Sequence, residues 1–147
     1  MGSILLVESD QIDTARDRLE SALREAGHEV LVAVTAREAF LRVSEGGIDV
    51  IVVDSADPRR GTIELARSLD ALPDAPPIVL VSGSPYAPEI SARIGAAAFL
   101  AKPCEPNELV AICERHTNST RPVRMIEDFG EDFAGDEDPT GPARQLG

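Results

Sequence analysis

The stretch VIVVD, residues 50–54, places an aspartate directly after four consecutive β-branched residues. A continuous apolar run of this kind predicts a strand that is buried on both faces, as in the centre of a parallel sheet. Runs of the same type occur at 4–7, 78–81 and 98–101, and a further strand is expected at 30–34. The chain therefore carries five predicted strands, with 50–54 in the middle of the sheet.

Segments with helical spacing of apolar residues separate these strands. Thr35 followed by Glu38 has the pattern of a capping box, which predicts a helix that starts at this point and ends near Gly46. The other helices are expected at about 11–26, 62–69, 88–94 and 105–115. Strands alternating with helices predict the α/β class with a doubly wound five-stranded parallel sheet of the flavodoxin-like type. Functional groups in such folds gather at the carboxyl ends of the strands.

Composition limits the domain organisation. The 147-residue chain is 43% apolar but only 3% aromatic, so we expect one core of Val, Ile, Leu and Ala. Periodicity stops near residue 117, and the rest contains three prolines, four glycines and seven acidic residues. Such a segment offers too little apolar surface to offset the entropy of ordering. We therefore predict a folded domain over 1–116 and an acidic disordered tail over 117–147.

The net charge and the cysteines limit which classes of partner and which cellular compartment are expected. The formal net charge is −12, which disfavours direct binding to nucleic acid or to anionic lipid. No apolar run reaches the roughly 20 residues of a membrane span, and no secretory signal is evident at the N-terminus. Cys104 and Cys113 are expected on opposite faces of one helix, too far apart to bridge. Two free thiols favour a cytoplasmic location.

Polar residues follow four of the predicted strands. Glu8-Ser9-Asp10 follows the first, Asp54 ends the third, Ser82 ends the fourth and Lys102 ends the fifth. Taken singly, each has an ordinary structural explanation, such as a helix cap or a turn. Lys102, however, is the only lysine in a chain whose other basic residues are arginines. Because the carboxyl ends of parallel strands share one edge, we expect these side chains to converge.

This arrangement resembles the receiver domain of two-component signalling over about residues 3–116. The resemblance implies that Asp54 accepts a phosphoryl group from a histidine kinase or a phosphotransfer protein. It implies that Ser82 is the hydroxyl switch, that Lys102 is the family's lysine and that Phe99 is the rotating switch aromatic. Such a domain is not an enzyme in its own right. With no output domain expected after residue 116, it would signal by protein–protein contact through the surface at about 88–115.

The resemblance also implies a Mg²⁺ site formed by Glu8, Asp10 and Asp54. Mg²⁺ prefers carboxylate, carbonyl and water ligands, and it would reduce the repulsion between a carboxylate and a phosphoryl group. Ser9 occupies a position where the family normally has a metal-binding aspartate. A neutral hydroxyl is a poorer ligand for this cation, so the Mg²⁺ site is expected to be weakened or absent.

The loop after Asp54 departs from the family pattern as well, because Asp57 replaces the usual Met and Gly61 comes one residue early. These departures leave two interpretations open. Either Asp54 is phosphorylated with weakened Mg²⁺ affinity, or the chain is a pseudo-receiver that signals by binding alone. A phosphatase of the haloacid-dehalogenase class is a third alternative, which is disfavoured because Ala56 stands where that class needs its acid/base aspartate.

Overall fold

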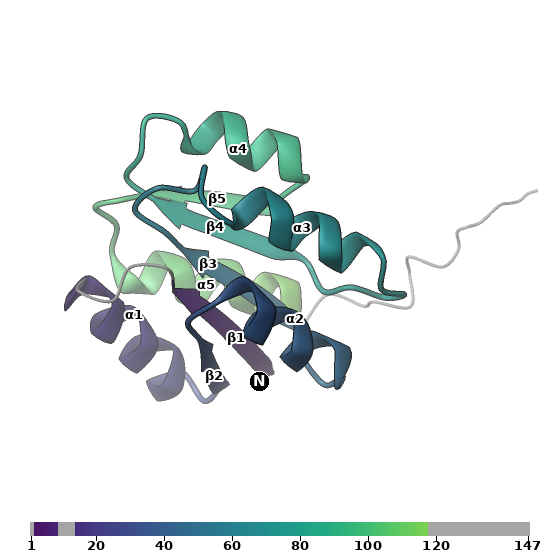
Figure 1. Cartoon of the computed structure of the whole chain (residues 1–147). Coiled ribbons are helices and arrows are strands. Elements are labelled where there is room, and N and C mark those ends of the chain that lie inside the picture. The colour runs from purple at the N-terminus through teal and green to yellow at the C-terminus, as the bar shows by residue number, and fades with distance from the viewer. Residues whose placement is uncertain (1, 9–13, 118–147) are drawn as a thin grey trace, which may run out of the picture.

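The computed structural model describes residues 2–8 and 14–117. It contains five strands and five helices in strict alternation (Figure 1). The strands are β1 Ser3–Glu8, β2 Glu29–Ala33, β3 Val50–Asp54, β4 Ile78–Ser82 and β5 Ala98–Ala101. The helices are α1 Thr14–Glu25, α2 Ala36–Ser44, α3 Thr62–Asp70, α4 Ala87–Ile94 and α5 Pro106–Thr117. Every predicted element is therefore present, with bounds that differ by a few residues.

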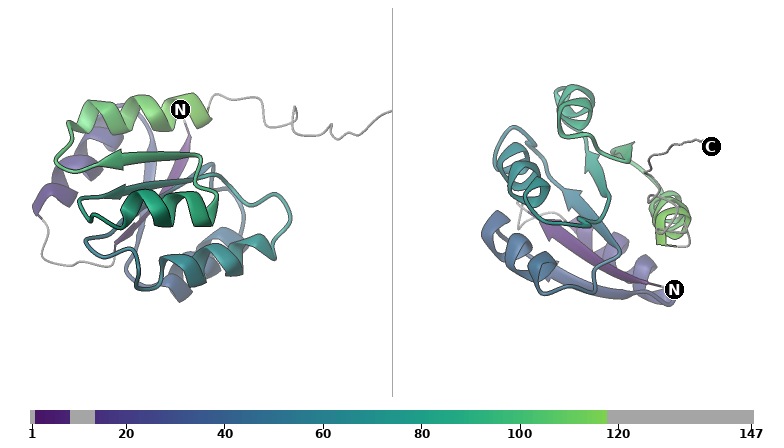
Figure 2. Two further views of the ribbon diagram at one scale, coloured as in Figure 1. Left: turned by 90° about the horizontal axis from the view of Figure 1, so that it is seen from above. Right: turned by 90° about the vertical axis from the view of Figure 1, so that its right-hand side faces the viewer.

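All strands pair in parallel in the order β2-β1-β3-β4-β5, which confirms the predicted doubly wound flavodoxin-like sheet. Strand β3 is central, and all five of its residues are buried. The sheet lies between two groups of helices, α1 and α5 on one face and α2, α3 and α4 on the other (Figure 2). This three-layer arrangement brings the carboxyl ends of β1, β3, β4 and β5 to one edge.

Side chains along each strand alternate between the two faces. Leu5, Val7, Ile51 and Val53 join the core under α2, α3 and α4. The residues next to them in the chain, among them Leu6 and Val52, join the core under α1 and α5. The alternation decides which polar residues at the strand ends can meet, because a side chain one position further on belongs to the opposite face.

The start of α2 shows how the sequence sets the helix ends. The Thr35 side chain accepts a hydrogen bond of 3.0 Å from the Glu38 amide, as the capping-box pattern predicts. The Glu38 carboxylate, in contrast, accepts from the amide of Val34, one residue before the expected donor. Half of the predicted capping box is therefore formed, and the other half is displaced by one residue.

The prediction for the cysteines is wrong in one respect. Cys104 precedes α5, which starts at Pro106, so the two cysteines do not share a helix. Both thiols are free, and both side chains pack against the same core, Cys113 fully buried and Cys104 partly. Burial raises the pKa of the Cys113 thiol to about 12.

The predicted tail falls almost wholly outside the described residues, since only its first residue, Thr117, belongs to α5. The division between a domain over 1–116 and a disordered tail stays a prediction. Within the part of the chain that is described, no helix combines the length and the apolar character needed to cross a membrane.

Candidate functional site

Two acidic side chains sit side by side where the central strands end. Glu8 ends β1 and Asp54 ends β3, and the strand register pairs them directly. Only 1% of Glu8 and 4% of Asp54 is exposed. Two neighbouring carboxylates withdrawn from water repel each other and call for compensating positive charge. This edge of the sheet therefore needs a cation.

Lys102, in the first position after β5, supplies one cation. Its Nζ lies 2.5 Å from Oδ1 of Asp54. The side chain of Lys102 is 18% exposed and that of Asp54 is 5% exposed, so the ion pair is largely shielded from solvent. The Lys102 amide also donates a hydrogen bond of 3.1 Å to the carbonyl of Ser82, which fixes the lysine backbone to the end of β4.

Ser82 completes the group of polar residues at the strand ends. It is 1% exposed, and its hydroxyl accepts a hydrogen bond of 3.1 Å from the amide of Ser84. The hydroxyl of Ser84 accepts in turn from the amide of Tyr86, also at 3.1 Å. Two successive serine hydroxyls thus hold the backbone of the β4–α4 loop. A movement of the Ser82 hydroxyl would act on the backbone of Ser84, whose own hydroxyl holds Tyr86. The structure therefore places Asp54, Ser82 and Lys102 at one edge, as the sequence predicts.

Arg59 is a site neighbour that the sequence analysis missed. Its Nε lies 2.9 Å from Oδ1 of Asp57, and its guanidinium lies 4.2 Å from the centre of the Tyr86 ring. The hydrogen bond from Arg59 lowers the pKa of the Asp57 carboxyl, and the bond to Asp57 raises the pKa of Arg59. These contacts link the β3–α3 loop to the β4–α4 loop. No sequence pattern predicts a cation–π contact between residues 27 positions apart.

The two linked loops surround an open pocket of about 520 Å³ next to the ion pair. It is lined by Ala56, Asp57, Arg59, Gly83, Ser84, Pro85, Tyr86 and Lys102. Lys102 therefore contacts Asp54 and also faces a space that a ligand can enter from solvent.

The donors expected to hold a metal are only partly described. Glu8 and Asp54 offer adjacent carboxylate oxygens, which are the ligand type that Mg²⁺ prefers. Ser9 and Asp10, which would supply the other expected ligand, lie outside the described residues. Among the residues that are described, no group of three His, Cys, Asp or Glu side chains is arranged to hold a metal ion. The two carboxylates fit a Mg²⁺ ion that takes its remaining ligands elsewhere.

Phe99, the predicted switch aromatic, lies on β5 at the edge of the sheet. It pairs in register with Leu80 of β4 and is partly buried against the core under α2, α3 and α4. Its partner Leu80 lies two residues before Ser82 along β4, so Phe99 is close to the strand end that carries the Ser82 hydroxyl.

Comparisons with known proteins agree with this geometry. The family model described as the response regulator receiver domain matches residues 4–114. The DNA-binding transcriptional regulator NtrC of Azospirillum brasilense is 30% identical over 89% of this chain, although the match spans only 28% of NtrC. Protein PilG of Pseudomonas aeruginosa is 28% identical, and here the match covers 80% of this chain and 90% of PilG.

A solved structure supports the same fold. The receiver domain of the sensor histidine kinase PA1611 from Pseudomonas aeruginosa PAO1, which has a magnesium ion coordinated in its active site cleft, superposes with a TM-score of 0.70. It is 24% identical, and the match covers 80% of this chain and 98% of that domain. Since the family model spans most of the chain and the strand-end residues take the expected places, the chain belongs to the response regulator receiver domain family.

Proposed function

We propose that this chain is a response regulator receiver that accepts a phosphoryl group on Asp54. One observation carries the proposal: the buried Asp54 carboxylate meets the Lys102 ammonium at 2.5 Å, beside Ser82 and an open pocket. The phosphodonor is a histidine kinase or a phosphotransfer protein. The similarity to protein PilG, whose length the match covers to 90%, supports a receiver-type role for this part of the chain.

The chemistry follows from the charges at the strand ends. A carboxylate oxygen of Asp54 forms a bond to phosphorus while the bond from phosphorus to the donor histidine nitrogen breaks, and the imidazole takes up a proton. Lys102 then pairs with the phosphoryl oxygens as a compact cation.

Mg²⁺ would be held by Glu8 and Asp54, with Asp10 as the third carboxylate. When bound, the ion reduces the repulsion between the carboxylate and the incoming phosphoryl group. The PA1611 receiver domain has a magnesium ion in its active site cleft, which supports the assignment. Ser9 removes one carboxylate from this set, so we expect weaker binding than in a site with aspartate there.

Signalling would proceed through a shift between two arrangements of the β4–α4 loop. The Ser82 hydroxyl donates to the new phosphoryl group and changes its distance to the Ser84 amide. Phe99 then repacks at the edge of the sheet, and the surface at about 88–115 presents the changed face to a downstream protein.

Phosphorylation can be tested with a small phosphodonor, such as acetyl phosphate, in the presence of Mg²⁺. Intact-mass spectrometry should show one added phosphoryl group on the wild type and none on Asp54→Asn. The matched control is Asp57→Asn, which removes a neighbouring exposed carboxylate and should leave phosphorylation in place. A phosphoryl group that persists in Asp54→Asn, or its absence from the wild type at saturating Mg²⁺, would contradict the proposal.

A second candidate is the pseudo-receiver, which binds a partner without phosphorylation. The serine at position 9, where the family normally has a metal-binding aspartate, favours it. Ser9→Asp separates the two candidates. If Mg²⁺ affinity is the only deficiency, this variant should accept phosphate faster than the wild type at the same Mg²⁺ concentration. If neither protein accepts phosphate, the pseudo-receiver is the correct assignment.

A further inference from the structure

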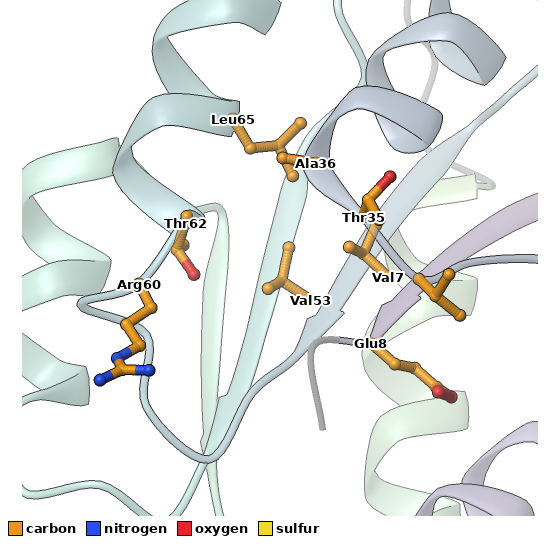
Figure 3. Close-up of a pocket in the computed structure, with 10 residues that line it drawn as sticks. Val7, Glu8, Thr35, Ala36, Val53, Arg60, Thr62 and Leu65 are labelled. Carbon is orange, nitrogen blue, oxygen red and sulfur yellow. The ribbon is translucent and has the colours of Figure 1, made fainter. Parts of the chain in front are cut away.

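A second cavity lies close to the phosphoacceptor but on the other face of the sheet. Its volume is about 90 Å³, and it opens between the starts of α2 and α3, above the ends of β1 and β3 (Figure 3). The walls are Val7, Glu8, Val34, Thr35, Ala36, Val53, Arg60, Gly61, Thr62 and Leu65. Half of these residues are aliphatic and most of the accessible lining surface is apolar, so the interior suits an alkyl group.

Strand alternation separates this cavity from the proposed phosphorylation site. Val7 and Val53 point to the face covered by α2 and α3. Glu8 and Asp54 follow them directly in the chain, so their side chains turn toward the opposite face. Figure 3 shows the carboxylate of Glu8 directed away from Val53 and Thr62. Glu8 therefore forms part of the cavity wall, but its carboxylate points out of the cavity.

One end of the cavity is polar, because Thr62 lies there. This residue is 4% exposed, and its hydroxyl forms no hydrogen bond with any residue in the described part of the chain. In Figure 3 the Thr62 oxygen points into the space beside Val53. The Thr62 oxygen is not one of the fully enclosed polar atoms that lack a partner, so it keeps some surface open to the cavity that Thr62 lines. A partner that enters the cavity would satisfy it.

The same end of the cavity is the N-terminus of α3. The helix begins at Thr62 after Gly61, which has a φ of 83° and provides no side-chain cap. Among the described residues, the amides of 62–64 have no hydrogen-bond acceptor. The first hydrogen bond of the helix runs from the Leu65 amide to the Gly61 carbonyl. Uncapped first-turn amides and the helix dipole favour a negatively charged group. Arg60 lines the rim with a side chain that is 88% exposed; its Nε lies 3.9 Å from Oδ2 of Asp57, and in Figure 3 its guanidinium points away from Thr62, so it contributes only a more distant positive charge.

We propose that this cavity binds a short aliphatic carboxylate. The carboxylate would accept hydrogen bonds from the Thr62 hydroxyl and the first-turn amides of α3, with the Arg60 guanidinium as a more distant positive charge. The alkyl chain would pack on Val7, Val53 and Leu65. A dry apolar cavity of about 150 Å³ holds benzene, so a cavity of 90 Å³ takes a ligand of about four to six non-hydrogen atoms. Branched acids of the size of isobutyrate match both the volume and the chemistry.

The test is an NMR titration of the full-length chain with sodium isobutyrate, compared with the neutral amide isobutyramide. Saturable shifts are expected for the amides of 61–65 and of Val53, and the amide ligand should bind at least about tenfold more weakly, because it loses the charge-assisted bonds. Failure of the carboxylate to saturate these signals, or equal binding of the amide, would overturn the proposal.

Variants test the polar end directly. Thr62→Val keeps the side-chain shape and should weaken binding about tenfold. Arg60→Gln changes an exposed residue, leaves the fold intact and should also weaken binding, whereas Arg67→Gln at the exposed end of α3 should not. Unchanged affinity in both Thr62→Val and Arg60→Gln would refute the site. Asp54→Asn should bind isobutyrate normally, so this result does not depend on whether Asp54 is phosphorylated.

Discussion

Replacement of Lys102 by methionine tests the electrostatics of the proposed phosphorylation site. The Nζ–Oδ1 separation of 2.5 Å corresponds to a gross attraction of about 7 kcal/mol at an effective dielectric constant of about 20. Desolvation of both groups offsets much of this attraction. Removing one member of a buried pair nevertheless costs about 3–5 kcal/mol, because the other charge stays in a poorly solvated place. Since Lys102 is 18% exposed, we expect Lys102→Met to lower the free energy of unfolding by about 3 kcal/mol.

The assay is urea unfolding at neutral pH with EDTA, because a divalent cation would replace the missing ammonium. Asp54→Asn and the double variant complete a double-mutant cycle. In Asp54→Asn/Lys102→Met neither partner is charged, so the double variant should be more stable than Lys102→Met alone. Mg²⁺ should raise the stability of Lys102→Met more than that of Asp54→Asn/Lys102→Met. Additive effects of the two substitutions would show that the pair contributes nothing, and the argument for a cation-dependent site would fail.

Three further outcomes are expected. Leu109→Ala removes a fully buried side chain of α5 and should cost about 3 kcal/mol in urea unfolding, whereas Leu41→Ala, at 48% exposed, should change stability by less than about 0.5 kcal/mol. Burial raises the pKa of the Cys113 thiol from an ordinary value of 9.0 to about 12, so its protonated form stabilises the fold fully below pH 9, and this stabilisation is lost as pH rises toward 12. Urea unfolding of Cys113→Ala over the same pH series should lack this loss. Iodoacetamide should modify Cys104 before Cys113. Thr35→Ala removes the cap of α2 and should cost about 1 kcal/mol, measured by thermal unfolding; no change would mean that the hydrogen bond to the Glu38 amide is dispensable.

The sequence predicts the fold almost completely because the fold depends on local patterns. The run at 50–54 is apolar at every position except the last, and its short length and β-branched residues favour a strand covered on both faces over a buried helix. Five runs of this kind, each followed by an amphipathic segment, leave few topologies. The convergence of Asp54, Ser82 and Lys102 then follows from the rule that parallel strands end at one edge.

Features that depend on contacts between loops could not be predicted in this way. The contact between Arg59 and Tyr86 depends on the relative positions of two loops, which no spacing encodes. Thr62 looks like an ordinary residue at a helix start, and its lack of a hydrogen-bond partner is visible only in three dimensions. Placing Cys104 and Cys113 in one helix overlooks the proline at the first helical position, Pro106, which starts α5 two residues after Cys104.

The position of Tyr86 has a practical consequence for spectroscopy. The chain has one tyrosine and no tryptophan, so all of its tyrosine fluorescence comes from a single ring. That ring faces the Arg59 guanidinium at 4.2 Å, in a loop tied through Ser84 to the hydroxyl proposed to move. The protein thus carries a built-in optical reporter at the rim of its own site, and ligand or phosphodonor binding can be followed in real time without a dye or a label.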